Sequence, residues 1–125
     1  MKTLTLALAD DHGAIRQSLT NFLSPYAHVL YSVSNGKDLT DLLAESHVLP
    51  DLCILDLDMP IMNGFITAQK IRKNWPDITV VIYSGNLSLE IRDALKQHGI
   101  THCYQKGADI KQLLAVVKGY GITVT

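Results

Sequence analysis

The stretch Leu52-Cys53-Ile54-Leu55-Asp56, near the middle of the chain, consists of four apolar residues followed directly by a carboxylate. A short run that is apolar at every position is typical of a strand covered on both faces, as parallel strands between helices are. We therefore predict a buried parallel strand over 52–55. Such a strand would bring Asp56 to the carboxyl end of a sheet, where open α/β sheets bind their ligands.

Four other apolar runs also end at polar residues. They are 4–9 before Asp10-Asp11, 28–33 before Ser34-Asn35-Gly36, 78–83 before Ser84, and 102–105 before Lys106. Between the runs, apolar residues recur every three or four positions, which places each set on one face of a helix. The helical sets are Ile15, Leu19, Phe22 and Leu23; Leu39, Leu42 and Leu43; Phe65, Ala68 and Ile71; Ile91, Ala94 and Leu95; and Ile110, Leu113, Leu114 and Val117.

The order of strand then helix, repeated five times, predicts an α/β fold. We expect a five-stranded parallel sheet of order 2-1-3-4-5, doubly wound with five helices in the flavodoxin-like arrangement. Asn35 and Asn63 are expected to open the second and third helices, and Gly99 to cap the fourth. We assign residues 1–120 to the domain and 121–125 to a tail or the start of a linker.

The composition fits one domain with a single hydrophobic core, because the chain has 125 residues and is 47% hydrophobic. The formal charge is −1, so we expect no direct nucleic-acid binding by this segment. No run approaches the roughly 20 apolar residues of a membrane span, and the apolar start runs straight into acids, unlike a secretory signal. Cys53 and Cys103 fall in separate strands as buried thiols, which suits a soluble protein of the cytoplasm.

Three carboxylates are predicted to meet at the switch point between strands one and three, where they would repel one another. A divalent cation would offset this charge, and hard oxygen ligands favour Mg²⁺. We expect Asp11 and Asp56 to be direct ligands, Asp10 to bind through water, and the backbone carbonyl of Asp58 to be a third protein ligand.

Asp56, if reachable from solvent beside the ion, is a plausible nucleophile towards phosphorus. Lys106 would then offset the charge of the phosphoryl oxygens, and Ser84 would donate a hydrogen bond to one of them. Each residue alone also has a simpler interpretation. The Asp10-Asp11 pair could cap a helix, Ser84-Gly85 could be a turn, and Lys106 a solvated surface charge. Their shared position at strand ends favours one phosphate-handling site.

The same residues resemble a known family over essentially the whole chain. The matching stretches are Asp10-Asp11-His12 with Arg16, residues 54–60 and 62–64 around Asp56, Ser84-Gly85, and Lys106-Gly107-Ala108. Their combination is similar to the receiver domain of bacterial two-component response regulators. The Asp-Asp-His opening and the Lys-Gly-Ala stretch resemble the NarL/FixJ group, whose members usually carry a LuxR-type helix-turn-helix after the receiver.

The resemblance implies that Asp56 accepts a phosphoryl group from a sensor histidine kinase or a phosphotransfer protein, with Mg²⁺ bound. It further implies that Ser84 moves towards the new anion and that the face of the fourth helix, fifth strand and fifth helix repacks, allowing a homodimer to form. The chain would then be a phosphoacceptor, not a turnover enzyme, and would control transcription through a DNA-binding domain outside this segment. The alternative is a stand-alone receiver that acts by protein–protein contact or as a phosphorelay intermediate.

The sequence departs from the family pattern at Cys103, where receivers have their switch aromatic. Tyr104 cannot replace that aromatic simply, because neighbouring strand residues point to opposite faces. Asp58 and Asn86 occupy positions where receivers tune the approach of hydrolytic water. We therefore expect Asp58→Asn to change the rate of dephosphorylation, and an unchanged decay of the phosphoprotein would contradict this.

The sequence disfavours three other functional classes. A phosphatase of the haloacid dehalogenase type shares the Asp56-Leu57-Asp58 spacing, but in that family the nucleophile strand comes first. A flavodoxin-like binding module would need a hydroxyl-rich phosphate loop where this chain has two acids, and a pure scaffold would not need the intact acid, hydroxyl and lysine set. The five histidines, His12, His28, His47, His98 and His102, lack metal-ligand spacing and are expected on the surface or in packing roles.

Overall fold

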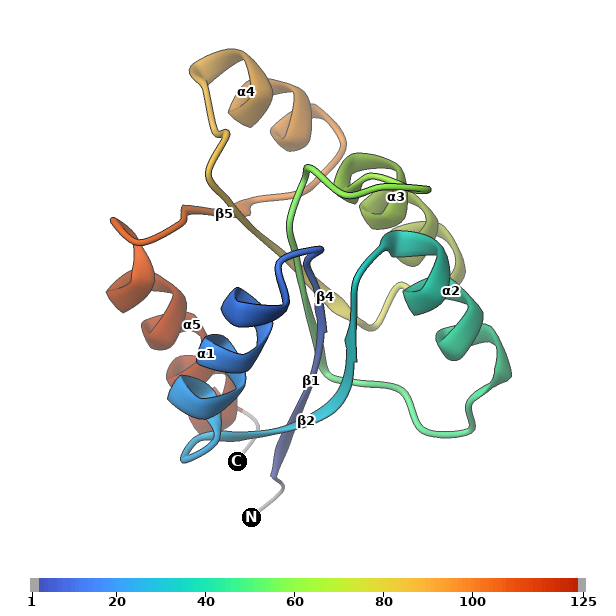
Figure 1. Cartoon of the computed structure of the whole chain (residues 1–125), viewed down its shortest axis with the longest axis vertical. Helices are drawn as coiled ribbons and strands as arrows, with labels where there is room; N and C mark the ends of the chain where they lie inside the picture. Colours follow the sequence, from blue (N-terminus) through green and yellow to red (C-terminus); the bar gives the residue numbers. More distant parts are fainter. Residues whose placement is uncertain (1–2, 124–125) are drawn as a thin grey trace.

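Five strands alternate with five helices in the computed structural model, which describes residues 3–123 and the side chains of residues 3–119 (Figure 1). The strands are β1 (Leu4–Ala9), β2 (Ala27–Val33), β3 (Leu52–Leu55), β4 (Thr79–Ser84) and β5 (His102–Gln105). The helices are α1 (Gly13–Leu23), α2 (Gly36–Glu45), α3 (Gly64–Asn74), α4 (Leu89–Gln97) and α5 (Ile110–Thr123). The predicted α/β order is confirmed.

All strand pairs are parallel and follow the order β2-β1-β3-β4-β5, as predicted from the sequence. β1 therefore lies between β2 and β3, and the strand order reverses there. Ala9 pairs with Leu55 at the carboxyl ends of β1 and β3. Asp56, the residue that follows β3, donates its backbone N–H to the carbonyl of Ala9 at 2.9 Å. This register sets the acids that follow both strands side by side.

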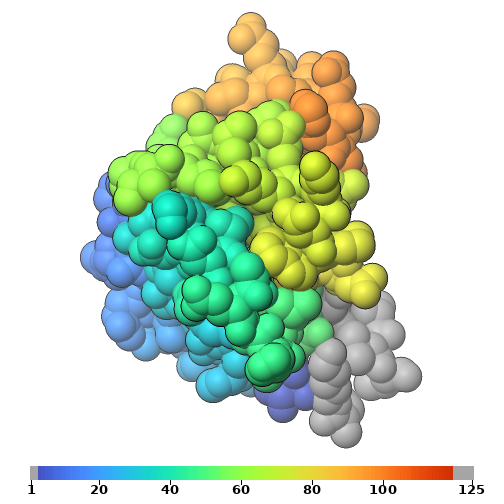
Figure 2. All heavy atoms as spheres, turned by 90° about the vertical axis from the view of Figure 1, so that its right-hand side faces the viewer, coloured from blue at the N-terminus to red at the C-terminus, as the bar shows by residue number. Residues whose placement is uncertain are grey.

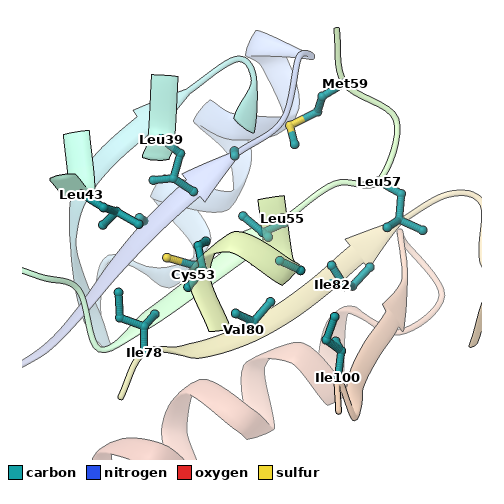
Figure 3. Packing of buried hydrophobic residues seen from close by; sticks show 14 of the residues in the cluster. Leu39, Leu43, Cys53, Leu55, Leu57, Met59, Ile78, Val80, Ile82 and Ile100 are labelled. Atoms are coloured by element: carbon teal, nitrogen blue, oxygen red, sulfur yellow. The ribbon is translucent and has the colours of Figure 1, made fainter. Parts of the chain in front are cut away.

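Two separate hydrophobic clusters cover the two faces of the sheet. Successive strand residues alternate between them, because side chains of a strand point to opposite faces. Cys53 and Leu55 belong to the cluster under α2, α3 and α4 (Figure 3). Leu52 and Ile54 belong to the one under α1 and α5. Figure 2 looks onto the first of these faces, where α2 and α3 lie side by side below α4. The sheet is thus buried on both sides, which explains its continuously apolar strands.

The predicted helix boundaries are confirmed where a side chain or a glycine fixes them. Asn35 Oδ1 accepts the N–H of Asp38 at 2.8 Å, and Asn63 Oδ1 accepts that of Ile66 at 2.9 Å. Gly99 has φ +78° after the end of α4 and donates its N–H to Lys96 O at 2.9 Å. The N–H of Ile100 bonds Leu95 O at 2.9 Å, which completes a Schellman motif.

The last helix extends further than the sequence indicated. α5 continues to Thr123, and residues 124–125 lie outside the described residues. The boundary between domain and tail at residue 120 stays a prediction. A glycine costs a helix only about 1 kcal/mol, so Gly119 and Gly121 do not by themselves stop it. Within residues 3–123, no helix has the length and apolar character to cross a membrane.

Both cysteines are free thiols, as predicted. Cys53 is fully buried on β3, and Cys103 is half-buried on β5, two strands away.

Candidate functional site

The three predicted carboxylates lie together at the carboxyl ends of β1 and β3. One ligand atom each from Asp10, Asp11, Asp56 and His12 falls within 4.8 Å of the others. Asp10 and Asp56 are buried, whereas Asp11 is exposed at the rim. The interpretation of the acid pair as a helix cap is excluded, because His12 occupies the N-cap position of α1 and makes no side-chain cap.

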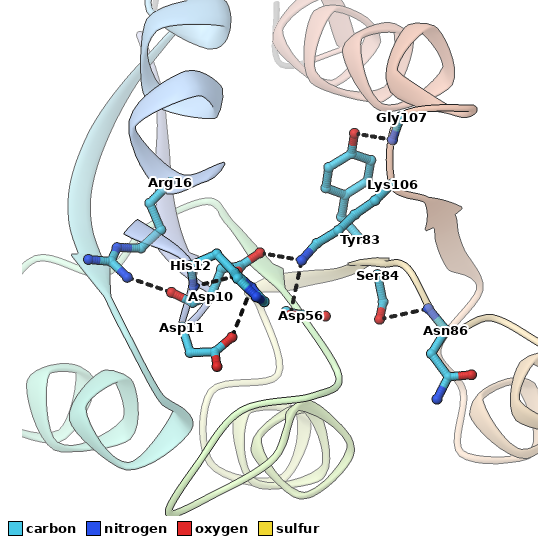
Figure 4. A network of polar contacts seen from close by, with 10 residues as sticks. All are labelled: Asp10, Asp11, His12, Arg16, Asp56, Tyr83, Ser84, Asn86, Lys106 and Gly107. Atoms are coloured by element: carbon cyan, nitrogen blue, oxygen red, sulfur yellow. Dashed lines mark hydrogen bonds and ion pairs between the residues drawn. The ribbon is translucent and has the colours of Figure 1, made fainter. Parts of the chain in front are cut away.

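Lys106 connects two of these acids from the end of β5. Its Nζ lies 2.8 Å from Asp10 Oδ2 and 3.1 Å from Asp56 Oδ2 (Figure 4). Partial burial by itself would lower the pKa of Lys106, but hydrogen bonds and charge attraction from Asp10 and Asp56 outweigh it and raise this pKa. Its side chain is 17% exposed, so Lys106 is not a solvated surface charge.

Asp56 differs from expectation in its accessibility. Its side chain is only 3% exposed, so the prediction that it is open to solvent is wrong for this arrangement. The cause is visible in the contacts: Lys106 Nζ lies on Oδ2, and the main chain around Asp56 is packed against β1 and the start of α3. Any molecule that approaches Asp56 Oδ2 therefore has to displace or pass the lysine ammonium.

His12 is a site residue that the sequence analysis missed. Its Nδ1 lies 3.1 Å from Asp10 Oδ1 and 3.1 Å from Asp11 Oδ1, and its backbone N–H donates to Asp10 Oδ1 at 2.9 Å. The ring is exposed, as expected for the histidines. Histidine spacing along one element could not reveal this contact, because the turn after β1 creates it; the adjacency to two acids was the available signal. Arg16 adds a bond from Nη1 to Asp10 O at 2.6 Å.

Ser84 ends β4 and is fully buried. Its Oγ accepts the backbone N–H of Asn86 at 3.4 Å, a long hydrogen bond. Asn86 and Asp58 line a cavity of about 570 Å³ together with Asp11, between the loop after β3 and the start of α4. The two residues expected near the hydrolytic water therefore border the acidic group from the solvent side.

The loop after β5 is held by hydrogen bonds from neighbouring elements. Gly107 N–H donates to Tyr83 Oη at 2.9 Å, and Gln105 Nε2 donates to Gly85 O at 2.9 Å. Cys103 packs against the α2–α4 cluster and Tyr104 against the α1–α5 cluster. The prediction that these two side chains point to opposite faces is confirmed.

Comparison with known proteins identifies this arrangement. The family model described as the response regulator receiver domain matches residues 6–118. The chain belongs to this family. It is therefore a receiver domain, the phosphoacceptor part of a response regulator.

Curated relatives support the assignment. The chain is 38% identical over 96 residues to the nitrate/nitrite response regulator protein NarL of Escherichia coli, covering 74% of this chain and 44% of NarL. It is 30% identical over 118 residues to the DNA-binding transcriptional regulator NtrC of Azospirillum brasilense, covering 94% of this chain and 24% of NtrC. The NarL match agrees with the resemblance to the NarL/FixJ group. The chain spans less than half the length of either relative.

Solved structures share the fold. A CheY-like receiver domain protein from Methanospirillum hungatei has a TM-score of 0.85 at 20% identity and covers 98% of this chain and 96% of its own. A DNA-binding response regulator of the LuxR family from Staphylococcus aureus has a TM-score of 0.83 at 23% identity, with 94% and 98% covered. At these identities the likeness establishes the architecture.

Proposed function

We propose that Asp56 is the residue that accepts the phosphoryl group in this receiver domain. The observation that carries the proposal is the contact of one lysine with two buried carboxylates, Asp10 and Asp56, beside the exposed carboxylate of Asp11 at the carboxyl end of the sheet. Among them, Asp56 follows the central strand directly and faces Lys106. A carboxylate in this setting is suited to forming an acyl phosphate.

The acidic group fits a magnesium ion by its donor set. Three carboxylates lie within 4.8 Å, and Lys106 offsets only part of their charge. Asp11 and Asp56 would hold the ion directly, Asp10 through water, and the backbone carbonyl of Asp58 would complete the protein ligands. Bound Mg²⁺ supplies positive charge that neutralises the phosphoryl oxygens.

The chain's own residues then have separate roles. Lys106 would exchange its contact with Asp56 Oδ2 for a phosphoryl oxygen, since a doubly charged anion attracts the ammonium more strongly than one carboxylate does. Ser84, whose present bond to Asn86 is long, would turn its hydroxyl towards the same anion. Asp10 would retain its bond to Lys106 and keep that side chain at the site.

The phosphoryl donor we propose is a phosphohistidine of a sensor histidine kinase or a phosphotransfer protein. In the transfer, an oxygen of Asp56 bonds to phosphorus as the bond from phosphorus to the histidine nitrogen breaks. The matches to NarL and NtrC, whose printed names describe regulators, favour transcriptional control through a domain outside this segment. The alternative is a stand-alone receiver that acts by protein–protein contact or as a phosphorelay intermediate, and the full-length sequence would separate the two. Phosphorylation could also produce a homodimer, which the mass in solution would reveal.

The deciding experiment incubates the protein with Mg²⁺ and acetyl phosphate and follows its intact mass. We expect a gain of one phosphoryl group in the native protein and none in Asp56→Asn. Asp58→Asn, which changes a neighbouring exposed acid, serves as the matched control and should still be phosphorylated. Equal mass gain in Asp56→Asn would disprove the assignment.

A second function, hydrolysis of phosphate esters, is the reading that the Asp56-Leu57-Asp58 spacing left open. The order of the elements disfavours it, because Asp56 follows the third strand, whereas the nucleophile strand comes first in phosphatases of the haloacid dehalogenase type. Sustained turnover of a phosphate ester by the purified protein would restore it, whereas we expect at most one phosphoryl group per chain before hydrolysis.

A further inference from the structure

Lys106 stands on a loop whose main chain is fixed at two successive points by β4. Its own N–H donates to Ser84 O at 2.9 Å, and the next N–H, that of Gly107, donates to Tyr83 Oη at 2.9 Å (Figure 4). The first contact continues the ladder between β4 and β5. The second is made by a side chain, so it depends on the residue at position 83.

The loop needs such a contact because of its local conformation. Gly107 has φ +77°, in the left-handed region, and a Cβ placed there would meet nothing within 4 Å. No side chain packs where a Cβ of residue 107 would project, so hydrogen bonds restrict this glycine: its carbonyl accepts the N–H of Ile110 at 3.4 Å, and its N–H donates to Tyr83. The hydrogen bond to Tyr83 restricts the residue directly after Lys106.

Tyr83 is well suited to act as a fixed anchor. Its side chain is 5% exposed and packs in the cluster between the sheet and helices α1 and α5. Beside it lies a cavity of about 460 Å³, lined by Tyr83, Lys106 and Gly107 together with residues of α1 and α5. This space would allow the loop to shift if the hydroxyl contact were lost.

We propose that Tyr83 is a positioning residue for Lys106: its hydroxyl holds the β5–α5 loop so that the lysine ammonium stays over Asp10 and Asp56. The inference rests on the proposed role of Asp56 as phosphoacceptor. Tyr83 acts through Lys106, by fixing where the lysine backbone lies, and its ring belongs to the core.

The test is the Tyr83→Phe variant, which removes only the hydroxyl and leaves the ring in its pocket. Phosphorylation by acetyl phosphate with Mg²⁺ is followed by intact mass; in this step an Asp56 oxygen bonds to phosphorus as the phosphorus–oxygen bond to the acetyl group breaks and acetate leaves. We expect an initial rate about three- to tenfold lower than native, the range set by the net worth of one hydrogen bond. Tyr31→Phe is the matched control, because Tyr31 Oη bonds Ser46 and Val48 O away from the acids. It should retain the native rate.

A double-variant comparison separates positioning from a general loss of structure. Tyr83→Phe should have little further effect in a Lys106→Ala background, since its action runs through the lysine. The proposal would be overturned if Tyr83→Phe reduced the phosphorylation rate by the same factor in the native and the Lys106→Ala proteins. A native rate in the single variant Tyr83→Phe would also overturn it.

A second measurement does not depend on phosphorylation. In the metal-free protein, an ammonium held between two carboxylates exchanges its protons slowly and gives a resolved signal in ¹H–¹⁵N spectra. We expect this Lys106 signal in the native protein and in Tyr31→Phe, and its loss in Tyr83→Phe; its persistence there would refute the positioning role. If the native protein gained no phosphoryl group, the proposed function would fail, while the spectra would still decide whether Tyr83 places Lys106.

Discussion

At the scale of single residues, the site depends on side-chain conformations that no pattern along the chain encodes. The sequence predicted that Asp10, Asp11, Asp56 and Lys106 would meet, because strand ends share an edge. It could not show that Lys106 bridges two acids, that Asp56 is covered, or that His12 contacts both acids after β1. These features follow from rotamers and from the turn geometry.

Gly64 illustrates a residue requirement that can be tested directly. A Cβ at position 64 would collide with the backbone carbonyl of Asp56, and its own N–H bonds Leu57 O at 2.9 Å. We expect Gly64→Ala to cost about 1–3 kcal/mol or more of unfolding free energy, because the main chain carrying Asp56 must move. Urea unfolding would measure this loss.

Gly85 provides the control for that substitution. A Cβ there would meet nothing within 4 Å, and its φ is not in the left-handed region. The free energy of unfolding of Gly85→Ala should therefore differ from that of the native protein by less than about 0.5 kcal/mol. Equal losses for both glycines would contradict the packing argument.

Cys53 gives a pH-dependent prediction. Burial raises the pKa of its thiol from 9.0 to about 12. Between these values the unfolded chain loses the proton while the folded chain keeps it, so stability falls as pH rises, by up to roughly 1.4 kcal/mol per pH unit from this group. In Cys53→Ala this slope is absent, and its stability deficit relative to native should shrink between pH 8 and pH 10.

Denaturant unfolding at both pH values would check the change. Cys103→Ala should show a smaller effect, because Cys103 is only half-buried and Arg92 partly offsets the raised pKa. A deficit for Cys53→Ala that stays constant with pH would contradict the prediction.

At the scale of elements, strand limits were the most predictable feature. β1, β3 and β5 begin and end at the residues that the apolar runs indicated. For β1 and β3 the cause is burial on both faces, which requires an apolar run, whereas β5 is only partly buried. The end of α5 was less predictable, because helix termination depends on small propensities that packing can outweigh.

The N-terminus of α2 offers a test at this scale. Asn35 is buried, and besides capping Asp38 N–H its Nδ2 donates to Asp38 Oδ2 at 3.2 Å. We expect Asn35→Ala to lower the unfolding free energy by about 1–2 kcal/mol. Ser88 caps α4 at an exposed position with a 3.2 Å bond, so Ser88→Ala should cost less. Thermal or urea unfolding would measure both losses. A larger loss for Ser88→Ala than for Asn35→Ala would show that burial does not determine how much these caps stabilise the protein.

At the scale of the whole molecule, the crowded acids couple ion binding to stability. A ligand that binds only the folded state stabilises it, so Mg²⁺ at millimolar concentration should raise Tm by a few degrees at matched ionic strength. Asp11→Asn should reduce this shift, because it removes a proposed ligand from the acidic group. Scanning calorimetry with and without Mg²⁺ would measure both.

Asp41→Asn is the control for that prediction. Asp41 pairs with Lys37 on the exposed face of α2, at 2.7 Å, and is no member of the acidic group. Its Mg²⁺ shift should equal the native one. A shift of the same size in Asp11→Asn would remove the support for an ion at this site.

The division of the interior into two hydrophobic clusters has a consequence for how the protein tolerates change. The two clusters share no residue, and the sheet separates them. Volume lost on one side cannot be refilled from the other, so substitutions in opposite clusters should combine additively. The α2–α4 cluster and the α1–α5 cluster can therefore accept substitutions independently of each other. The polar residues at the carboxyl end of the sheet lie next to both clusters, so substitutions in either one can affect them.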